Sequence, residues 1–130
     1  VAGISIEMIA YITPVSKQVC KLVIYLPEHS SWYSLKDQYE TYLGILTNKY
    51  GRPTSTYSDF TGGYEEGDGY EMTAVAVDKC LYSAFWLDKL PNLNLGINIT
   101  KYKQVRISYE NERLMVIKDK ETSQLQSSVF

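Results

Sequence analysis

The chain is short of the residues and charges that most often reveal a function. It has two cysteines, one histidine and three phenylalanines, and 13 basic against 15 acidic residues leave a net charge of −2. A charge so balanced provides no basic surface for a nucleic acid or for an anionic membrane. No apolar run approaches the roughly 18 residues of a membrane-spanning helix. The sequence therefore argues against a nucleic-acid partner and against a spanning segment.

The two cysteines, Cys20 and Cys80, lie 60 positions apart. That separation matches no metal-ligand or redox spacing. Both fall within predicted strands, and two interpretations remain open. They are buried free thiols, or they form a disulfide between neighbouring strands, which would indicate an oxidising compartment.

Tyrosine is the residue in excess, with 12 copies among 130 residues. A tyrosine suits a half-buried sheet because its ring packs while its hydroxyl reaches water. The other interpretation is a binding face lined by tyrosine.

One long helix is predicted within residues 30–53. Ser30 or Ser31 can cap its first turn. Gly51 stands where a helix ends in a residue with positive φ, and Pro53 prevents continuation. Between these ends, an apolar stripe recurs at helical spacing: Leu35, Tyr39, Tyr42, Leu43, Leu46 and Tyr50. We expect Leu43 and Leu46, at the centre of the stripe, to be buried against a sheet.

Short strands are predicted for most of the remaining chain. Residues 3–12 alternate as a half-buried strand, and a turn at 13–18 joins them to a strand at 19–26. After the helix, strands are predicted at four segments: 54–60, 80–87, 95–99 and 105–109. Residues 88–94 are expected to form a connecting loop, and residues 101–104 a tight one. Together these segments indicate a hairpin, a helix and an antiparallel meander.

Residues 70–77 fit either a strand or a helix. Their apolar residues alternate as in a strand, but Asp68 followed by Glu71 is a candidate capping box. The capping pattern slightly favours a short helix.

The predicted fold class is therefore α+β. Residues 1–111 are expected to form one domain, an antiparallel sheet of about five to seven strands with one long helix packed across one face. Residues 112–130 are expected to be a C-terminal extension: residues 112–121 have helical propensity, and a helix or a continued strand there is expected to fray into a loose tail over the polar residues 123–128.

An acidic, glycine-rich loop is the best candidate for a site. Five carboxylates fall within 13 residues: Asp59, Glu65, Glu66, Asp68 and Glu71. Hard cations take several carboxylate oxygens, but this spacing does not match the EF-hand loop. We expect an exposed, mobile loop without a specific metal, and these residues are only weak metal candidates. The adjacent glycines lack the Lys-Ser or Lys-Thr pair of a phosphate-binding loop.

His29 is the only histidine and lies at the start of the predicted helix. Nothing near it in the sequence resembles a nucleophile elbow. We therefore expect a histidine in a surface loop, no catalytic residue and no cofactor.

Five segments carry a resemblance to other proteins. They are residues 1–3, the set Trp32, Leu35 and Tyr39, and residues 49–53, 67–72 and 105–109. In these segments the chain resembles a group of small exported proteins of gut anaerobic bacteria that have no assigned activity. The resemblance implies a periplasmic or secreted setting. The resemblance also implies that such proteins carry a further helix and hairpin before this unit, and the sequence here does not include them. Without that part, the strand at 3–12 is expected to have an open edge that recruits a second copy.

The function expected from these observations is a non-enzymatic binding or interaction module of the bacterial envelope. Its expected partner is a protein or a glycan, and a homodimer through an open sheet edge fits the same pattern. The alternative is a cation-dependent hydrolase that uses the acidic loop at 59–71.

Overall fold

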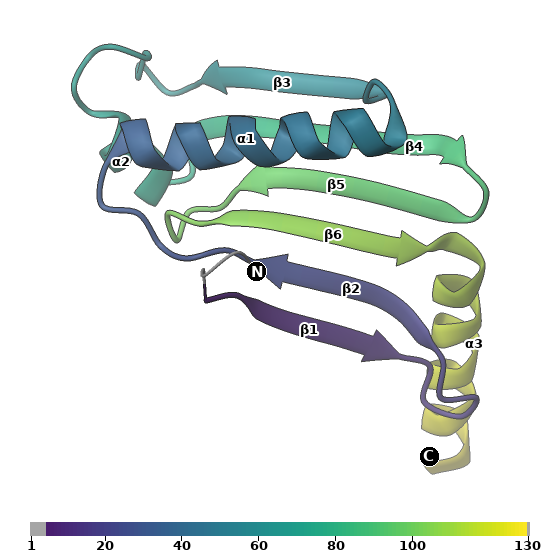
Figure 1. Cartoon of the computed structure of the whole chain (residues 1–130). Helices are drawn as coiled ribbons and strands as arrows, with labels where there is room; N and C mark the ends of the chain where they lie inside the picture. The colour runs from purple at the N-terminus through teal and green to yellow at the C-terminus, as the bar shows by residue number, and fades with distance from the viewer. Residues whose placement is uncertain (1–4, 130) are drawn as a thin grey trace.

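The computed structural model describes residues 5–129, in which six strands form one antiparallel sheet accompanied by three helices (Figure 1). In chain order the elements are β1 (Glu7–Ile12), β2 (Val19–Tyr25), α1 (Trp32–Tyr50), β3 (Ser55–Phe60), α2 (Glu71–Ala76), β4 (Cys80–Leu90), β5 (Leu93–Ile99), β6 (Val105–Asn111) and α3 (Glu112–Val129). The prediction of an α+β fold is confirmed.

The strand order across the sheet is β1-β2-β6-β5-β4-β3. The N-terminal hairpin of β1 and β2 therefore joins the meander through the antiparallel pair of β2 and β6. Helix α1 crosses one face of the sheet, as predicted, and packs closest to the two central strands, β5 and β6. Figure 1 shows β1 as the strand farthest from it. The strand order leaves β1 and β3 as the two edge strands of the sheet.

Helix α1 begins and ends where the sequence predicts. Ser31 is its N-cap, and its hydroxyl oxygen accepts a hydrogen bond from the Ser34 N–H at 3.3 Å. Gly51 follows the last turn with φ 86° and donates its N–H to the Thr47 carbonyl at 2.8 Å. The Gly51 carbonyl in turn accepts from the Trp86 indole N–H at 2.7 Å. Strand β4 therefore holds the end of the helix through one buried side chain.

Replacing Gly51 by alanine should lower the free energy of unfolding by about 1–3 kcal/mol, because residues with a Cβ strongly disfavour this backbone conformation. The new Cβ would also lie 3.3 Å from the Lys89 ammonium nitrogen. Gly44→Ala is the matched control, since Gly44 lies inside α1 with no atom within 4 Å of its would-be Cβ. That change should stabilise the protein by about 0.5–1 kcal/mol. Equal effects of the two changes on chemical denaturation would contradict this account.

The core lies between α1 and the helix-facing side of β4, β5 and β6. Leu35, Tyr39 and Leu46 of the predicted stripe are buried, and Tyr42, Leu43 and Tyr50 pack against them with part of their surface exposed. The expectation that Leu43 is buried is therefore only partly right. The sheet contributes the alternating residues predicted for its strands: Tyr82, Ala84, Trp86, Leu95, Ile97, Ile99, Val105 and Ile107.

Strand β1 is less buried than its alternation predicts. It begins at Glu7 rather than residue 3, and residues 1–4 lie outside the described residues. Met8 is 55% exposed and Ile12 is 47% exposed, although both belong to the apolar face of the pattern. The reason is position, because β1 is an edge strand and α1 packs closest to the central strands β5 and β6, away from β1 (Figure 1).

The C-terminal segment is a helix almost throughout. Helix α3 continues to Val129, so the prediction of a loose tail after residue 123 is wrong. The Asn111 carboxamide caps its start by accepting from the Leu114 N–H at 3.0 Å. Farther along, the buried Glu121 carboxylate accepts from the Ser16 N–H at 3.0 Å and from the Ser16 hydroxyl at 2.6 Å. These bonds hold α3 against the turn between β1 and β2, a partner that is remote in sequence.

Two segments between the main elements had open or different predictions. The loop expected at 88–94 is instead two strand ends joined by a turn at Pro91 and Asn92, since β4 runs to Leu90 and β5 starts at Leu93. The short helix favoured at 70–77 is confirmed as α2. Its N-cap is Tyr70, however, and not Asp68 as the capping-box prediction required.

Candidate functional site

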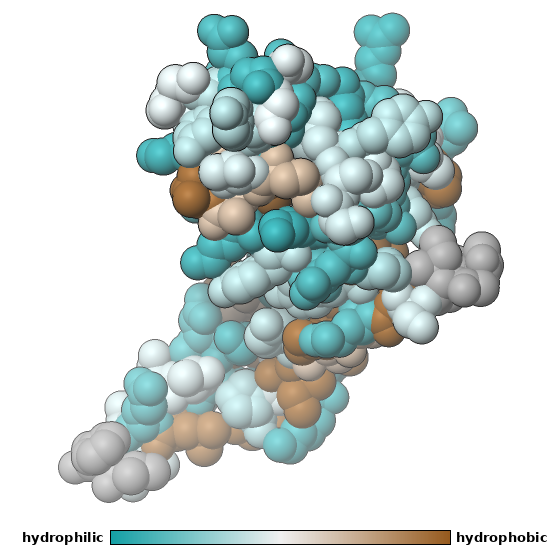
Figure 2. Space-filling model, turned by 90° about the vertical axis from the view of Figure 1, so that its left-hand side faces the viewer, coloured by the Kyte–Doolittle hydropathy of each residue, from teal (hydrophilic) through white to brown (hydrophobic). Residues whose placement is uncertain are grey.

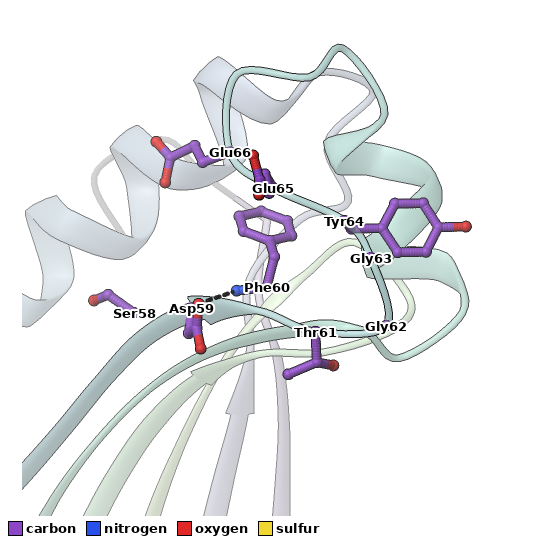
Figure 3. Close-up of a pocket in the computed structure, with 9 residues that line it drawn as sticks. All are labelled: Ser58, Asp59, Phe60, Thr61, Gly62, Gly63, Tyr64, Glu65 and Glu66. Carbon is purple, nitrogen blue, oxygen red and sulfur yellow. Dashed lines mark hydrogen bonds between the residues drawn. The ribbon is translucent and has the colours of Figure 1, made fainter.

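The acidic loop encloses an open cavity of about 410 Å³ between itself and the end of β3. Figure 3 shows the Phe60 ring standing in this region, with Glu66 and Tyr64 directed to opposite sides of it. The wall consists of residues 58–66, which include three of the five predicted carboxylates. The cavity is therefore acidic, with one aromatic ring from the core.

The carboxylates of the loop bind the loop's own backbone. Asp68 accepts from the Tyr70 N–H at 2.7 Å and from the Glu65 N–H at 3.0 Å. These bonds, above all that from Glu65, lower the pKa of Asp68. Glu71 accepts from the Gly67 N–H at 2.8 Å. Within residues 5–129, no three acidic, histidine or cysteine side chains are placed to hold a metal ion together.

Glu66 connects the loop to two other elements. Its carboxylate lies 2.5 Å from the Lys36 ammonium of α1 and accepts a hydrogen bond from the Tyr82 hydroxyl of β4. The bond to Lys36 is the larger cause, and that to Tyr82 the second, of the lowered pKa of Glu66. The same contact raises the pKa of Lys36. Glu66 is thus a structural link, which the sequence did not single out from the other carboxylates.

Four aromatic rings pack edge to face beneath this link. The Trp32 ring centre lies 5.2 Å from that of Phe60 and 5.1 Å from that of Tyr82, and Tyr39 lies 5.6 Å from Tyr82. Such pairs stabilise a core beyond the area they bury. Burial is the main cause of the raised pKa of the Tyr39 and Tyr82 hydroxyls. The tyrosine excess is thus partly explained by core packing.

The contribution of Glu66 to stability should depend on pH. Because its pKa is lowered in the folded state, that contribution is fully present above about pH 4.5, its ordinary value, and is lost as the pH falls through the lowered pKa. Glu66→Gln should cost about 1 kcal/mol or less at pH 7, since both charged partners are partly in water. Chemical denaturation should show the difference from wild type shrink as the pH falls below Glu66's ordinary pKa, and vanish once the carboxyl is protonated in the folded state. A difference that persists there would assign the effect to packing instead.

Both cysteines are free thiols. Cys20 is buried, and its Sγ lies 3.3 Å from the Tyr11 carbonyl oxygen. The disulfide that remained open in the sequence required neighbouring strands, but β6 and β5 separate β2 from β4. Burial raises the pKa of the Cys80 thiol to about 12, so Cys80 is uncharged and a poor nucleophile at neutral pH.

His29 is half-buried and bonded at the start of α1. Its Nδ1 lies 3.0 Å from the Ser34 hydroxyl, and its Nε2 lies 2.7 Å from the Gln38 carboxamide oxygen. The Ser34 hydroxyl is also 2.8 Å from that of Ser31, the N-cap. The imidazole therefore ties the preceding loop to the first turns of the helix.

The sheet edge at β1 is the most distinctive surface. Among the described residues, β1 pairs with β2 alone. Beside it, an apolar groove of about 200 Å³ separates the sheet from α1, and Met8 and Ile45 stand on its two walls. Ile45, an apolar residue of α1, is 52% exposed. Figure 2 shows hydrophobic residues gathered at the height of β1. Sequence alternation identified β1 as a strand, but it could not show that this apolar face would be left uncovered.

No protein-family model, curated protein or solved structure matches the chain. Within residues 5–129, none of the helices combines the length and the apolar character needed to cross a membrane.

Proposed function

We propose that the protein is a non-enzymatic interaction module of the bacterial envelope, and that its binding element is the β1 edge. The observation that supports this proposal is an apolar edge strand, from Glu7 to Ile12, with one side of its backbone unpaired in the described chain. An open edge offers its N–H and C=O groups to a strand of another protein. The partner is therefore a protein segment in extended conformation.

The composition of β1 favours recruitment over protection. Natural proteins shield open edges with lysine, proline or inward charges. β1 has one charged residue, Glu7, and contains neither lysine nor proline. The opposite edge, β3, is built from serine, threonine, tyrosine and aspartate before it reaches the buried Phe60. Of the two edges, β1 is thus the one with an apolar surface to cover.

The adjacent groove gives such a partner a place for side chains. A strand added beside β1 would direct alternate side chains to the side that carries α1. On that side Met8 and Ile45 are exposed, and Lys49 lines the same groove. Apolar side chains of the partner would cover the first two.

The state of the acidic loop favours a binding protein over the hydrolase alternative. A metal or a catalytic acid requires carboxylates that are available, but Asp68 and Glu71 are engaged by backbone N–H groups and Glu66 by Lys36 and Tyr82. Calorimetric titration with calcium or magnesium should give no saturable heat at sub-millimolar concentration. A stoichiometric site abolished by Asp68→Ala would overturn the proposal.

Site-specific photocrosslinking tests the binding element directly. A photoreactive residue at Met8, on β1, should capture partner protein from an envelope fraction, and the same residue at Thr56, on the β3 edge, should not. Both positions are exposed and lie on edge strands of one sheet. Capture at both positions, or at neither, would contradict strand recruitment at β1.

A further inference from the structure

The β1 strand is complementary to itself. We infer that the strand recruited at this edge is β1 of a second copy, in an antiparallel pair centred on Ile9, so that two six-stranded sheets become one. The inference rests on the proposed function, because it names the partner of the same edge. It follows from the symmetry, charge and exposure of residues 6–12.

Symmetry restricts how β1 can pair with itself. In an antiparallel pair, residues directly opposite each other point to the same face of the sheet. A two-fold axis must then run perpendicular to the sheet and pass beside a residue that faces its own copy. Ile9 is the midpoint of residues 6–12. With Ile9 on the axis, Met8 faces Ala10, Glu7 faces Tyr11, and both α1 helices lie on one face of the joined sheet.

The charges on the face opposite α1 fit this register. Within one copy, Tyr11 is paired with Lys21, and Lys21 with Glu110. Glu7 is paired with Tyr25, and Tyr25 with Arg106. Across the junction the row therefore reads Glu110, Lys21 and Tyr11 of one copy, then Glu7, Tyr25 and Arg106 of the other.

Opposite charges alternate along that row, and no two like charges adjoin. The Lys21 ammonium already lies 2.9 Å from the Glu110 carboxylate and 5.6 Å from the Tyr11 ring centre. The Glu7 carboxylate of the second copy would arrive on the far side of Tyr11, so that only the β1 strand separates it from Lys21. The arrangement is repeated by the two-fold axis, so each copy gains the same favourable neighbour.

The apolar face of β1 gains cover in the same arrangement. Met8 and Ile12, both largely exposed, would lie beside Ala10 and Ile6 of the second copy on the side of α1. The one irregularity between β1 and β2 falls at Tyr11 and Ile12, which leaves residues 7–11 regular for pairing. A junction about six residues long buries less surface area than a standard protein–protein interface. We therefore expect a reversible dimer with a dissociation constant on the order of micromolar or weaker.

Complementary charges at Ile9 test both the dimer and its register. In sedimentation experiments, wild type should associate as its concentration rises. Ile9→Lys alone and Ile9→Glu alone should each weaken association by roughly a hundredfold, because like charges would face each other on the axis. An equimolar mixture of the two variants should associate again. Thr56→Lys, on the other edge, should behave as wild type, and circular dichroism establishes that each variant is folded.

Ile9 is paired with the buried Val23, so a charge at Ile9 could also disturb the fold. Cysteine pairing provides a second test without such a charge. In a Cys80→Ser background, Met8→Cys mixed with Ala10→Cys should form a disulfide-linked pair, since directly opposite residues have the Cα separation that a disulfide requires. Each variant oxidised alone should give far less product. Both positions are exposed, so the fold should be retained.

The outcomes separate this inference from the proposed function. Wild type that stays monomeric at millimolar concentration would overturn the self-pairing, and photocrosslinking from Met8 to another protein would still support an interaction module. A dimer that is insensitive to Ile9→Lys would also overturn it, because the copies would then meet elsewhere. A monomer that crosslinks to nothing from Met8 would overturn both.

Discussion

Replacing Trp86 by alanine should lower the free energy of unfolding by about 3–5 kcal/mol, the largest effect expected of a single change in this chain. Trp86 has no exposed surface, and its ring lies in the core between β4 and α1. Alanine would leave a cavity that the surrounding sheet cannot close, because its strands are held by their hydrogen-bonded register. The loss would also release the Gly51 carbonyl, which the Trp86 indole N–H binds at 2.7 Å.

Trp86→Phe separates these two contributions. Phenylalanine retains most of the buried ring surface but cannot donate to the Gly51 carbonyl. Because Gly51 is exposed, water can replace the lost donor, and the cost of the missing hydrogen bond should be about 1 kcal/mol. Urea denaturation of both variants gives the comparison. If Trp86→Ala cost no more than Trp86→Phe, cavity formation would not be the cause.

Replacing Leu46 by alanine should cost about 2–5 kcal/mol, because Leu46 is buried in the α1 stripe against the sheet. Alanine is the better helix former, so the loss cannot come from helix propensity and must come from packing against the sheet. Ile45→Ala is the matched control. Its side chain is half exposed at the groove beside β1, and its removal should change the free energy of unfolding by less than about 1 kcal/mol. A denaturation midpoint unchanged in Leu46→Ala would contradict the position of α1 over the core.

These effects concern the part of the fold that was predicted best. The ends of α1 follow from local chemistry, since Ser31 caps the first N–H groups and Gly51 accepts a positive φ. The helix-facing side of β4, with Tyr82, Ala84 and Trp86, follows from strict alternation. Both signals lie within a few residues of the feature they determine, so a sequence can display them.

The errors have a common origin in contacts remote along the chain. Helix α3 continues past residue 123 and is held by Glu121 at the turn that contains Ser16, more than 100 positions away. In the sequence, Glu66 is one of five similar carboxylates. Only the fold brings Lys36 and Tyr82 into contact with it. In each case tertiary pairing, rather than local preference, determines the outcome.

The candidate binding edge shows the same division. By itself, the sequence indicated a strand with one apolar face within residues 3–12, because side chains alternate with a period of two, and the structure has this strand at Glu7–Ile12. It also determined the length and limits of α1. Only the tertiary structure decided that β1 stands at the edge of the sheet and that α1 packs closest to the central strands β5 and β6. The physical reason is that alternation specifies which residues share a face, whereas the order of strands and the position of the helix depend on how all the apolar faces are buried together.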